Sequence, residues 1–239
     1  MTLGTLPTEQ LRIASYNIQK CVGLDLRRQP RRILNVLNDL NADIVVLQEA
    51  DKRLPPRPAA LPHFVIEEAG WQAANLGGAG SLGWHGNAVI WRRSDIRLAE
   101  LGHIRLPGLE PRGAVRVTFE TGMGPLRVVG MHLGLFSAHR HKQVKHLADE
   151  MARWPDLPTV WAGDFNEWSA QPILDRLAPR LRFLPPRPSF PSPQPMGPLD
   201  RIALGAGLVA LDHGVHSTRP AHIASDHLPV WADIAPAES

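Results

Sequence analysis

The chain has 239 residues, of which 44% are hydrophobic and 21% are charged. This composition supports a folded core, so it excludes a disordered or collagen-like chain. Twenty-six Lys and Arg residues against 23 Asp and Glu residues give a net charge of +3, which permits a phosphate-bearing partner without indicating one.

Apolar periodicity and turn residues predict the elements in chain order. Strands are expected at residues 11–17, 43–48, 64–67, 87–92, 114–120, 126–132, 159–162, 200–204 and 229–234. Helices are expected from Pro30 to Leu40, from Ala138 to Met151 and from Ala170 to Leu177. Two helix-linked strand pairs and many short strands indicate a mixed α/β protein with large, mainly antiparallel sheets.

We expect one domain over residues 1–239, with a flexible tail at residues 1–9. The proline-rich stretches 54–62 and 185–198 are interpreted as ordered surface loops in that domain. A single cysteine, Cys21, cannot form an internal disulfide and is expected to be at least half-buried. No signal-peptide pattern or apolar run of membrane-spanning length occurs, which favours a cytoplasmic location, and no obligate protein partner is evident.

Polar residues stand where the predicted strands begin or end. They are Asn17, Glu49, His132, Asp164, Asn166, Asp200, Asp226 and His227. Singly, the asparagines and Asp164 have an ordinary interpretation as turn residues. Glu49 is not readily explained as a turn residue. A carboxylate after the apolar run VVLQ is costly to desolvate unless a cation or hydrogen-bond donors compensate its charge. Carboxylates, amides and imidazoles at one edge of a sheet are typical of a metal and phosphate site.

The order of these residues resembles the endonuclease/exonuclease/phosphatase superfamily of metal-dependent phosphohydrolases. The resemblance rests on SYNIQ (15–19), VVLQEA (45–50), GNAVIWRR (86–93), PRGAVRV (111–117), VVGMHLG (128–134), AGDFNEW (162–168), SFPSPQPMGPLDRI (189–202) and SDHLPV (225–230). It implies a four-layer αββα sandwich, in which helices flank two packed, mainly antiparallel sheets and the site lies at one end.

The resemblance also implies the cofactor. Glu49 would be the principal ligand of a divalent cation, with Asn17 beside it and Asp226 across the site. Oxygen ligands favour Mg²⁺ or Mn²⁺ over zinc.

The remaining roles are implied in the same way. Asp164 would orient or deprotonate the attacking water, or protonate the leaving group, and Asn166 would donate its amide to a phosphate oxygen. His227, held by Asp200, and His132 would contact the phosphate as charge develops. The reaction expected is hydrolysis of a phosphodiester or phosphomonoester by in-line attack of water.

The substrate stays open at this point. Candidate substrate-binding residues are Arg112, Asn87 and Trp84. A small or lipid-headgroup phosphodiester and a nucleic acid are both compatible, and a noncatalytic phosphate-binding protein is the alternative from another class. Arg140 and Gln143 are interpreted as structural anchors, and His139, His141 and His146 as solvated helix residues rather than a metal cluster.

Overall fold

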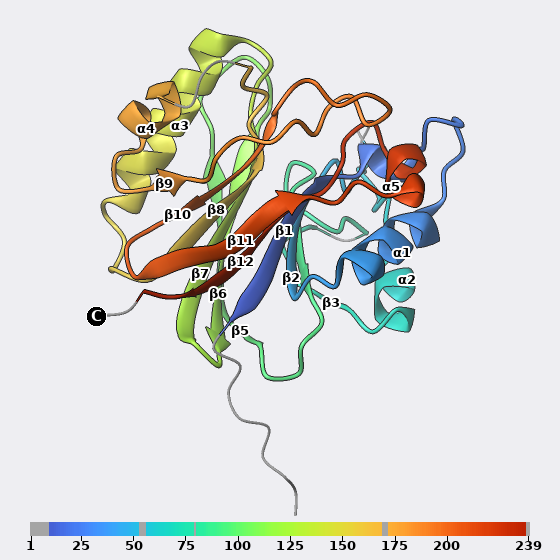
Figure 1. Cartoon of the computed structure of the whole chain (residues 1–239), viewed down its shortest axis with the longest axis horizontal. Helices are drawn as coiled ribbons and strands as arrows, with labels where there is room; N and C mark the ends of the chain where they lie inside the picture. Colours follow the sequence, from blue (N-terminus) through green and yellow to red (C-terminus); the bar gives the residue numbers. More distant parts are fainter. Residues whose placement is uncertain (1–9, 53–55, 79, 169–171, 238–239) are drawn as a thin grey trace, which may run out of the picture.

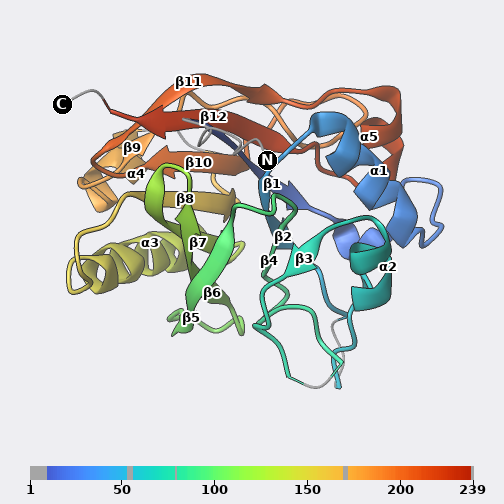
Figure 2. The ribbon, with the colours of Figure 1, turned by 90° about the horizontal axis from the view of Figure 1, so that it is seen from below.

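The computed structural model describes residues 10–52, 56–78, 80–168 and 172–237, so the expected tail at residues 1–9 lies outside the described residues. Two six-stranded sheets pack face to face, and helices cover their outer faces (Figures 1 and 2). The predicted αββα sandwich is therefore confirmed.

The first sheet has the order β11-β12-β1-β2-β4-β3. Its strands are β11 (Leu208–Val215), β12 (Val230–Pro236), β1 (Leu11–Asn17), β2 (Ile44–Gln48), β4 (Ala88–Trp91) and β3 (Gln72–Ala73). Only the β1–β2 pair among these described strands is parallel.

The second sheet has the order β5-β6-β7-β8-β10-β9. Its strands are β5 (Arg97–Arg105), β6 (Gly113–Thr121), β7 (Gly124–His132), β8 (Thr159–Asp164), β10 (Asp200–Leu204) and β9 (Arg182–Phe183). Here the β7–β8 pair is parallel, whereas the other described pairs are antiparallel.

Helices form the two outer layers. The first sheet is covered by α1 (Pro30–Leu40), α2 (His63–Glu68) and α5 (Arg219–Ala224), near the short 3₁₀ turn η1 (Gln19–Cys21). The second sheet is covered by α3 (Ser137–Met151) and α4 (Pro172–Leu177). Helix α1 begins at Pro30 and ends at Leu40, because the next residue, Asn41, has a left-handed φ of 58°. None of the helices in the described ranges has the length and apolar character needed to cross a bilayer.

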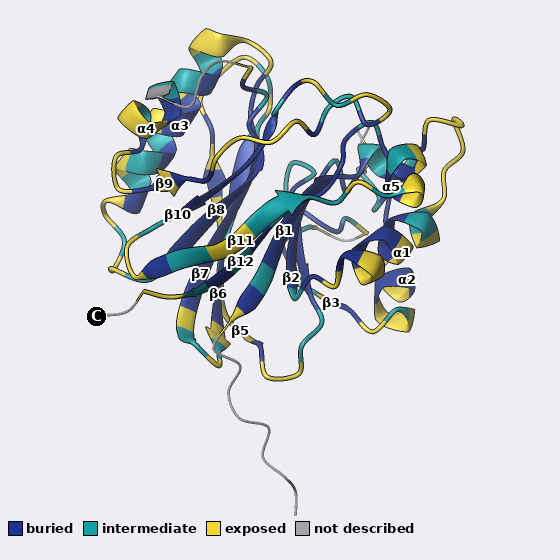
Figure 3. Ribbon diagram, in the orientation of Figure 1, coloured by how far each residue is buried: buried dark blue, intermediate teal, exposed yellow. Residues whose placement is uncertain are grey.

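The main core lies between the sheets, where alternate residues such as Ile13, Val46, Val128 and Val160 are fully buried (Figure 3). Gly130 allows the sheets to approach closely at this interface. A Cβ atom at Gly130 would lie 2.6 Å from Cγ1 of Val46. The sheets are therefore held at a fixed spacing, so the groups at their ends have a fixed separation.

Two sequence predictions about this fold need correction. Residues 64–67 are not a strand but part of α2, which follows Pro62 and buries Val65 and Ile66 on one side. The edge strands β5 and β11 were not predicted, because their exposed residues do not alternate with buried ones. The predicted burial of Cys21 is confirmed, since its exposed fraction is 1%.

The two proline-rich stretches contact neighbouring segments through their backbones. The amide of Ala60 donates to the carbonyl of Ala50, and the amide of Ser192 donates to the carbonyl of Asp226. Residues 54 and 55 of the first stretch lie outside the described residues.

Candidate functional site

The strand register brings the predicted polar residues to one end of the sandwich. In the first sheet, Asn17 at the end of β1 pairs with Gln48, which precedes Glu49. In the second sheet, Asp164 at the end of β8 pairs with His132 on one side and Asp200 on the other. We call this the site end, where β1, β2, β7 and β8 finish and β4, β6, β10 and β12 begin.

Asp164 is the central group of the site. It is 1% exposed, and its Oδ2 accepts a hydrogen bond of 2.9 Å from Nδ2 of Asn17, which belongs to the opposite sheet. The same oxygen lies 3.4 Å from Nε2 of His132 and 3.7 Å from Nε2 of His227. Its Oδ1 accepts a hydrogen bond of 2.9 Å from the backbone amide of Asn166. Asp164 therefore connects both sheets and both histidines.

His227 is held by Asp200, as the resemblance implied. Nδ1 of His227 lies 2.8 Å from Oδ2 of Asp200, and that oxygen also accepts a 2.5 Å hydrogen bond from the hydroxyl of Ser189. Burial disfavours the imidazolium, but the attraction and hydrogen bond of Asp200, with further attraction from Asp164, outweigh it. The pKa of His227 is raised to about 9, so the ring is cationic at neutral pH.

His132 has the opposite protonation state. It is 5% exposed, and burial lowers its pKa to about 3, although the attraction of Asp164 opposes that change. The charges of Arg112 and His227 lower the pKa further. The site thus places a neutral and a cationic imidazole beside one carboxylate. Such a difference between the pKa values of neighbouring groups is typical of catalytic acids and bases.

We expect the metal-free protein to show this difference between the pKa values of His132 and His227 directly. By NMR, His227 should titrate near pH 9, whereas His132 should stay neutral down to about pH 4. Because the pKa of His227 rises on folding, its contribution to stability should be complete below about pH 6.5 and lost as the pH rises through 9. Resonances are assigned with His227→Gln and His132→Gln, and a His227 that titrates near 6.5 would contradict the geometry.

Glu49 stands on a strained stretch of backbone. Its φ is +53°, and the three residues of η1, Gln19, Lys20 and Cys21, have φ values of +44°, +55° and +60°. Left-handed conformations of such residues are costly and recur at functional sites. The turn places Nζ of Lys20 in an ion pair with Oε2 of Glu49, so this carboxylate already attracts a cation.

The predicted metal-binding residues share this edge of the first sheet. Glu49 follows β2, Asn17 ends β1, and Asp226 precedes β12, which pairs with the far side of β1. The hydroxyl of Ser225 fixes the Asp226 segment by donating to the carbonyl of Asn17 at 2.7 Å. These groups offer only oxygen ligands, and such a donor set fits a hard divalent cation.

A second group of possible ligands comprises Asp164, Asp200 and His227, whose ligand atoms lie within 4.8 Å of one another. It is compatible with a metal ion. However, Nδ1 of His227 and Oδ2 of Asp200 are already engaged in a hydrogen bond with each other. The other edge, at Glu49, is therefore the better candidate for a metal ligand.

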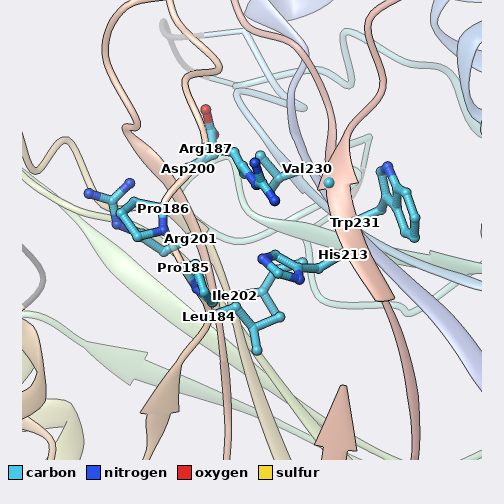
Figure 4. A pocket seen from close by; sticks show the side chains of 11 residues that line it. Leu184, Pro185, Pro186, Arg187, Asp200, Arg201, Ile202, His213, Val230 and Trp231 are labelled. Carbon is cyan, nitrogen blue, oxygen red and sulfur yellow. The ribbon is translucent and has the colours of Figure 1, made fainter. Parts of the chain in front are cut away.

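A pocket with a volume of about 600 Å³, large enough for an ester substrate, opens beside Glu49 and His132. Its further lining is Lys20, Asp51, Lys52, Arg57, His85, Gly86, Glu110, Pro111, Arg112, Leu135 and Phe136. A second cavity, behind Asp200, has a volume of only about 20 Å³ (Figure 4). It is large enough for about one water molecule. Only the first of these two pockets can hold an ester substrate.

Of the three predicted substrate-binding residues, one lines the large pocket and two do not. Arg112 lines the large pocket, but its Nε and Nη2 donate to Oε2 of Glu110 at 3.1 and 3.0 Å. Asn87 is fully buried and donates to the carbonyl of Gly113 at 2.9 Å. Trp84 stacks on His103 with ring centroids 4.8 Å apart. Neither Asn87 nor Trp84 lines the pocket, so the structure does not place them with the site.

Helix α3 connects the loops of the site, as expected for Arg140 and Gln143. The side chain of Gln143 accepts from the amide of Gly134 and donates to the carbonyl of Pro107, both at 2.9 Å. Arg140 contacts the carboxylate of Glu167 at 3.3 Å, just beyond Asn166. His141 also lies 3.3 Å from that carboxylate and is half-buried, so it is not the solvated helix residue that was predicted.

Sequence reasoning missed Lys20 and Ser189. Ser189 opens the segment 189–202 that carried part of the resemblance, but its hydrogen bond to Asp200 spans 11 residues and had no local signal. Lys20 lies one residue beyond the SYNIQ segment, and its contact with Glu49 depends on the left-handed turn.

Comparisons with known proteins identify the family of the chain. The model of the Endonuclease/Exonuclease/phosphatase family matches residues 14–227. The protein YbhP of Escherichia coli (strain K12) is 33% identical over 163 residues, which span 64% of this chain and 63% of YbhP. This match thus spans less than two thirds of the length of that relative.

Solved structures show the same fold. An endonuclease/exonuclease/phosphatase family protein from Bacteroides thetaiotaomicron superposes with a TM-score of 0.76 at 18% identity, covering 98% of this chain and 100% of that one. TDP2 of D. rerio, complexed with a single-strand DNA product, superposes with a TM-score of 0.73 at 16% identity, covering 95% and 99%. With the family match over residues 14–227, the chain belongs to the endonuclease/exonuclease/phosphatase family.

Proposed function

We propose that the protein is a divalent-metal-dependent phosphodiesterase that hydrolyses P–O bonds by in-line attack of water. The observation that carries the proposal is the position of Asp164, which contacts Asn17 and lies within 3.7 Å of two imidazoles, one neutral and one cationic. Phosphoester hydrolysis requires an aligned water and compensation of developing charge more than a covalent nucleophile. This arrangement offers both.

Glu49 and Asp226, with the amide oxygen of Asn17, would hold Mg²⁺ or Mn²⁺. When bound, the ion would neutralise the phosphate and polarise the ester. Asn17 keeps one amide hydrogen on Asp164, so this residue would couple the metal edge to the carboxylate.

Asp164 would orient the attacking water and accept its proton, because one of its oxygens faces both histidines. Cationic His227 would donate to a phosphate oxygen through Nε2, since Nδ1 is bound to Asp200. Asn166 has one amide hydrogen on the carbonyl of Leu133 at 3.0 Å, which leaves the other for the phosphate. Neutral His132 would provide a second, uncharged contact with the phosphate.

A salt-controlled activity panel tests the proposal. The protein is incubated with Mg²⁺ or Mn²⁺ and with one of three substrates: bis(p-nitrophenyl) phosphate, supercoiled plasmid or abasic duplex. The Asp164→Asn variant is the inactive control. We expect turnover of the small diester that needs metal and is lost in the variant. Cleavage of nucleic acid alone would instead make the protein a nuclease, a candidate favoured by its structural likeness to TDP2 of D. rerio with single-strand DNA.

Absence of both activities in the wild type would contradict the proposal and favour a noncatalytic phosphate-binding protein. The cytoplasmic location stays a prediction from the sequence.

A further inference from the structure

Exposed large apolar side chains gather at the site end. Among the described residues, the exposed large hydrophobics outside that end are Phe64, Leu98 and Leu211. Of the others, Ile223 lies in α5, and the rest lie in the loops that follow β1, β5, β7, β8 and β9. Scattered single apolar residues on a surface are ordinary, but a group around one site indicates an interaction surface.

The opposite end of the sandwich provides an internal comparison. Its loops, residues 41–43, 92–96, 121–124, 152–158 and 205–207, connect the same strands and helices. No exposed large hydrophobic side chain occurs in these described loops. The apolar character therefore belongs to the site end, not to loops of this fold in general.

The two most exposed of these side chains occupy loop tips. Leu26 is 87% exposed and Leu109 is 90% exposed. Leu26 has a left-handed φ of +58°, which is uncommon for a bulky residue. Leu109 follows Gly108, whose φ is +137°. Such tips usually carry Gly, Asn, Asp or Ser. Contact with an apolar environment would explain why both positions carry leucine instead.

The other apolar side chains are held in place around the same site. The amide of Leu135 donates to Glu110 at 3.0 Å, and the amide of Leu24 donates to the carbonyl of Ile223 at 3.0 Å. Trp168 packs over Gly197 and lies 6.3 Å from Phe190 between ring centroids, and Phe190 lies 4.9 Å from His227. In Figure 1 the loop before α1, the 184–199 loop and the start of α3 lie along one edge.

Positive charge accompanies these side chains. Lys52 and Arg57 line the large pocket beside Leu135 and Phe136. Within the described ranges, neither Lys52 nor Arg57 forms an ion pair with a carboxylate, whereas the nearby Glu110 is paired with Arg112 at 3.0 Å. A surface with apolar tips and unpaired cations complements an anionic lipid bilayer.

We propose that the site end docks onto an anionic phospholipid surface, with Leu26 and Leu109 inserted among the headgroups. Docking would bring the phosphodiester of a lipid headgroup to the pocket at Glu49 and His132. This choice of substrate rests on the proposed phosphodiesterase function, whereas the docking itself does not. Leu26 and Leu109 offer no ring on which a base could stack, so the two most exposed tips favour a bilayer over a nucleic acid.

Co-sedimentation with vesicles tests the docking. The probes are vesicles of phosphatidylcholine alone and of phosphatidylcholine mixed with an equal part of phosphatidylglycerol. Wild-type protein should bind the mixed vesicles, and the double variant Leu26→Ser with Leu109→Ser should bind roughly 10-fold more weakly or worse. The matched control, Leu98→Ser with Leu211→Ser, should bind like the wild type. Lys52→Glu with Arg57→Glu should remove the preference for phosphatidylglycerol.

Hydrolysis of bis(p-nitrophenyl) phosphate in solution separates the two proposals. The Leu26 and Leu109 variant should keep wild-type turnover of this soluble diester. Vesicle binding without any hydrolysis would support docking and overturn the proposed function. Hydrolysis without vesicle binding, or equal loss of binding in the control variant, would overturn docking. Binding of single-stranded DNA but not vesicles, weakened by the same leucine substitutions, would also overturn it.

Discussion

Replacement of Asp164 by asparagine should lower turnover of a phosphodiester by roughly 100- to 10,000-fold, because the site loses its proton acceptor. The substitution keeps the shape of a side chain that is 1% exposed. Its amide group would face Nδ2 of Asn17 or the backbone amide of Asn166, both donors. The free energy of unfolding should therefore fall by about 1–3 kcal/mol. Steady-state kinetics and thermal unfolding check both expectations.

The matched control is Asp156→Asn, which removes a carboxylate that is exposed and paired with Arg180 at the opposite end. Its turnover should equal that of the wild type. Asp164→Asn protein that folds and still turns over at the wild-type rate would show that Asp164 is not the acceptor.

Replacement of Glu49 by glutamine should act on the metal. Removing one formal charge from the ligand set should raise the concentration of Mg²⁺ that gives half-maximal activity by roughly 100-fold. Turnover at saturating metal should recover more than in Asp164→Asn, because the proton acceptor remains. The variant also removes the ion pair with Lys20, so folding is measured alongside.

Glu68→Gln serves as the control for this second variant, since Glu68 is exposed and pairs with Arg31 far from the pocket. An unchanged metal dependence in Glu49→Gln would remove Glu49 from the ligand set. It would then favour the alternative group of Asp164, Asp200 and His227.

The sequence predicted the strands that carry the site because those strands are buried. β1, β2, β7 and β8 show near-continuous apolar runs, and each is nearly or fully buried. Edge strand β5 is exposed along most of its length, so its residues carry no such pattern. Helix α2 was mistaken for a strand because its short apolar run fits both periods.

Contacts that depend on tertiary packing could not be predicted from the sequence. The polar residues at strand ends were found, since register places them together. Trp71, for example, is 2% exposed and donates to Oδ1 of Asn38 at 2.9 Å. Asn87 was expected near substrate, but its amide holds the loop before β4 against β6. In both cases the partner is distant along the chain, and the local sequence gives no sign of it.

The proposed activity is metal-dependent hydrolysis of a phosphodiester. The most direct measurement is the rate of bis(p-nitrophenyl) phosphate hydrolysis by chelator-treated protein before and after Mg²⁺ or Mn²⁺ is added back, with Asp164→Asn prepared in parallel. We expect no turnover without metal, restored turnover with it, and a rate in the variant that is lower by orders of magnitude. Equal rates with and without metal would contradict a metal-dependent reaction, and equal rates in the two proteins would contradict the catalytic role of Asp164.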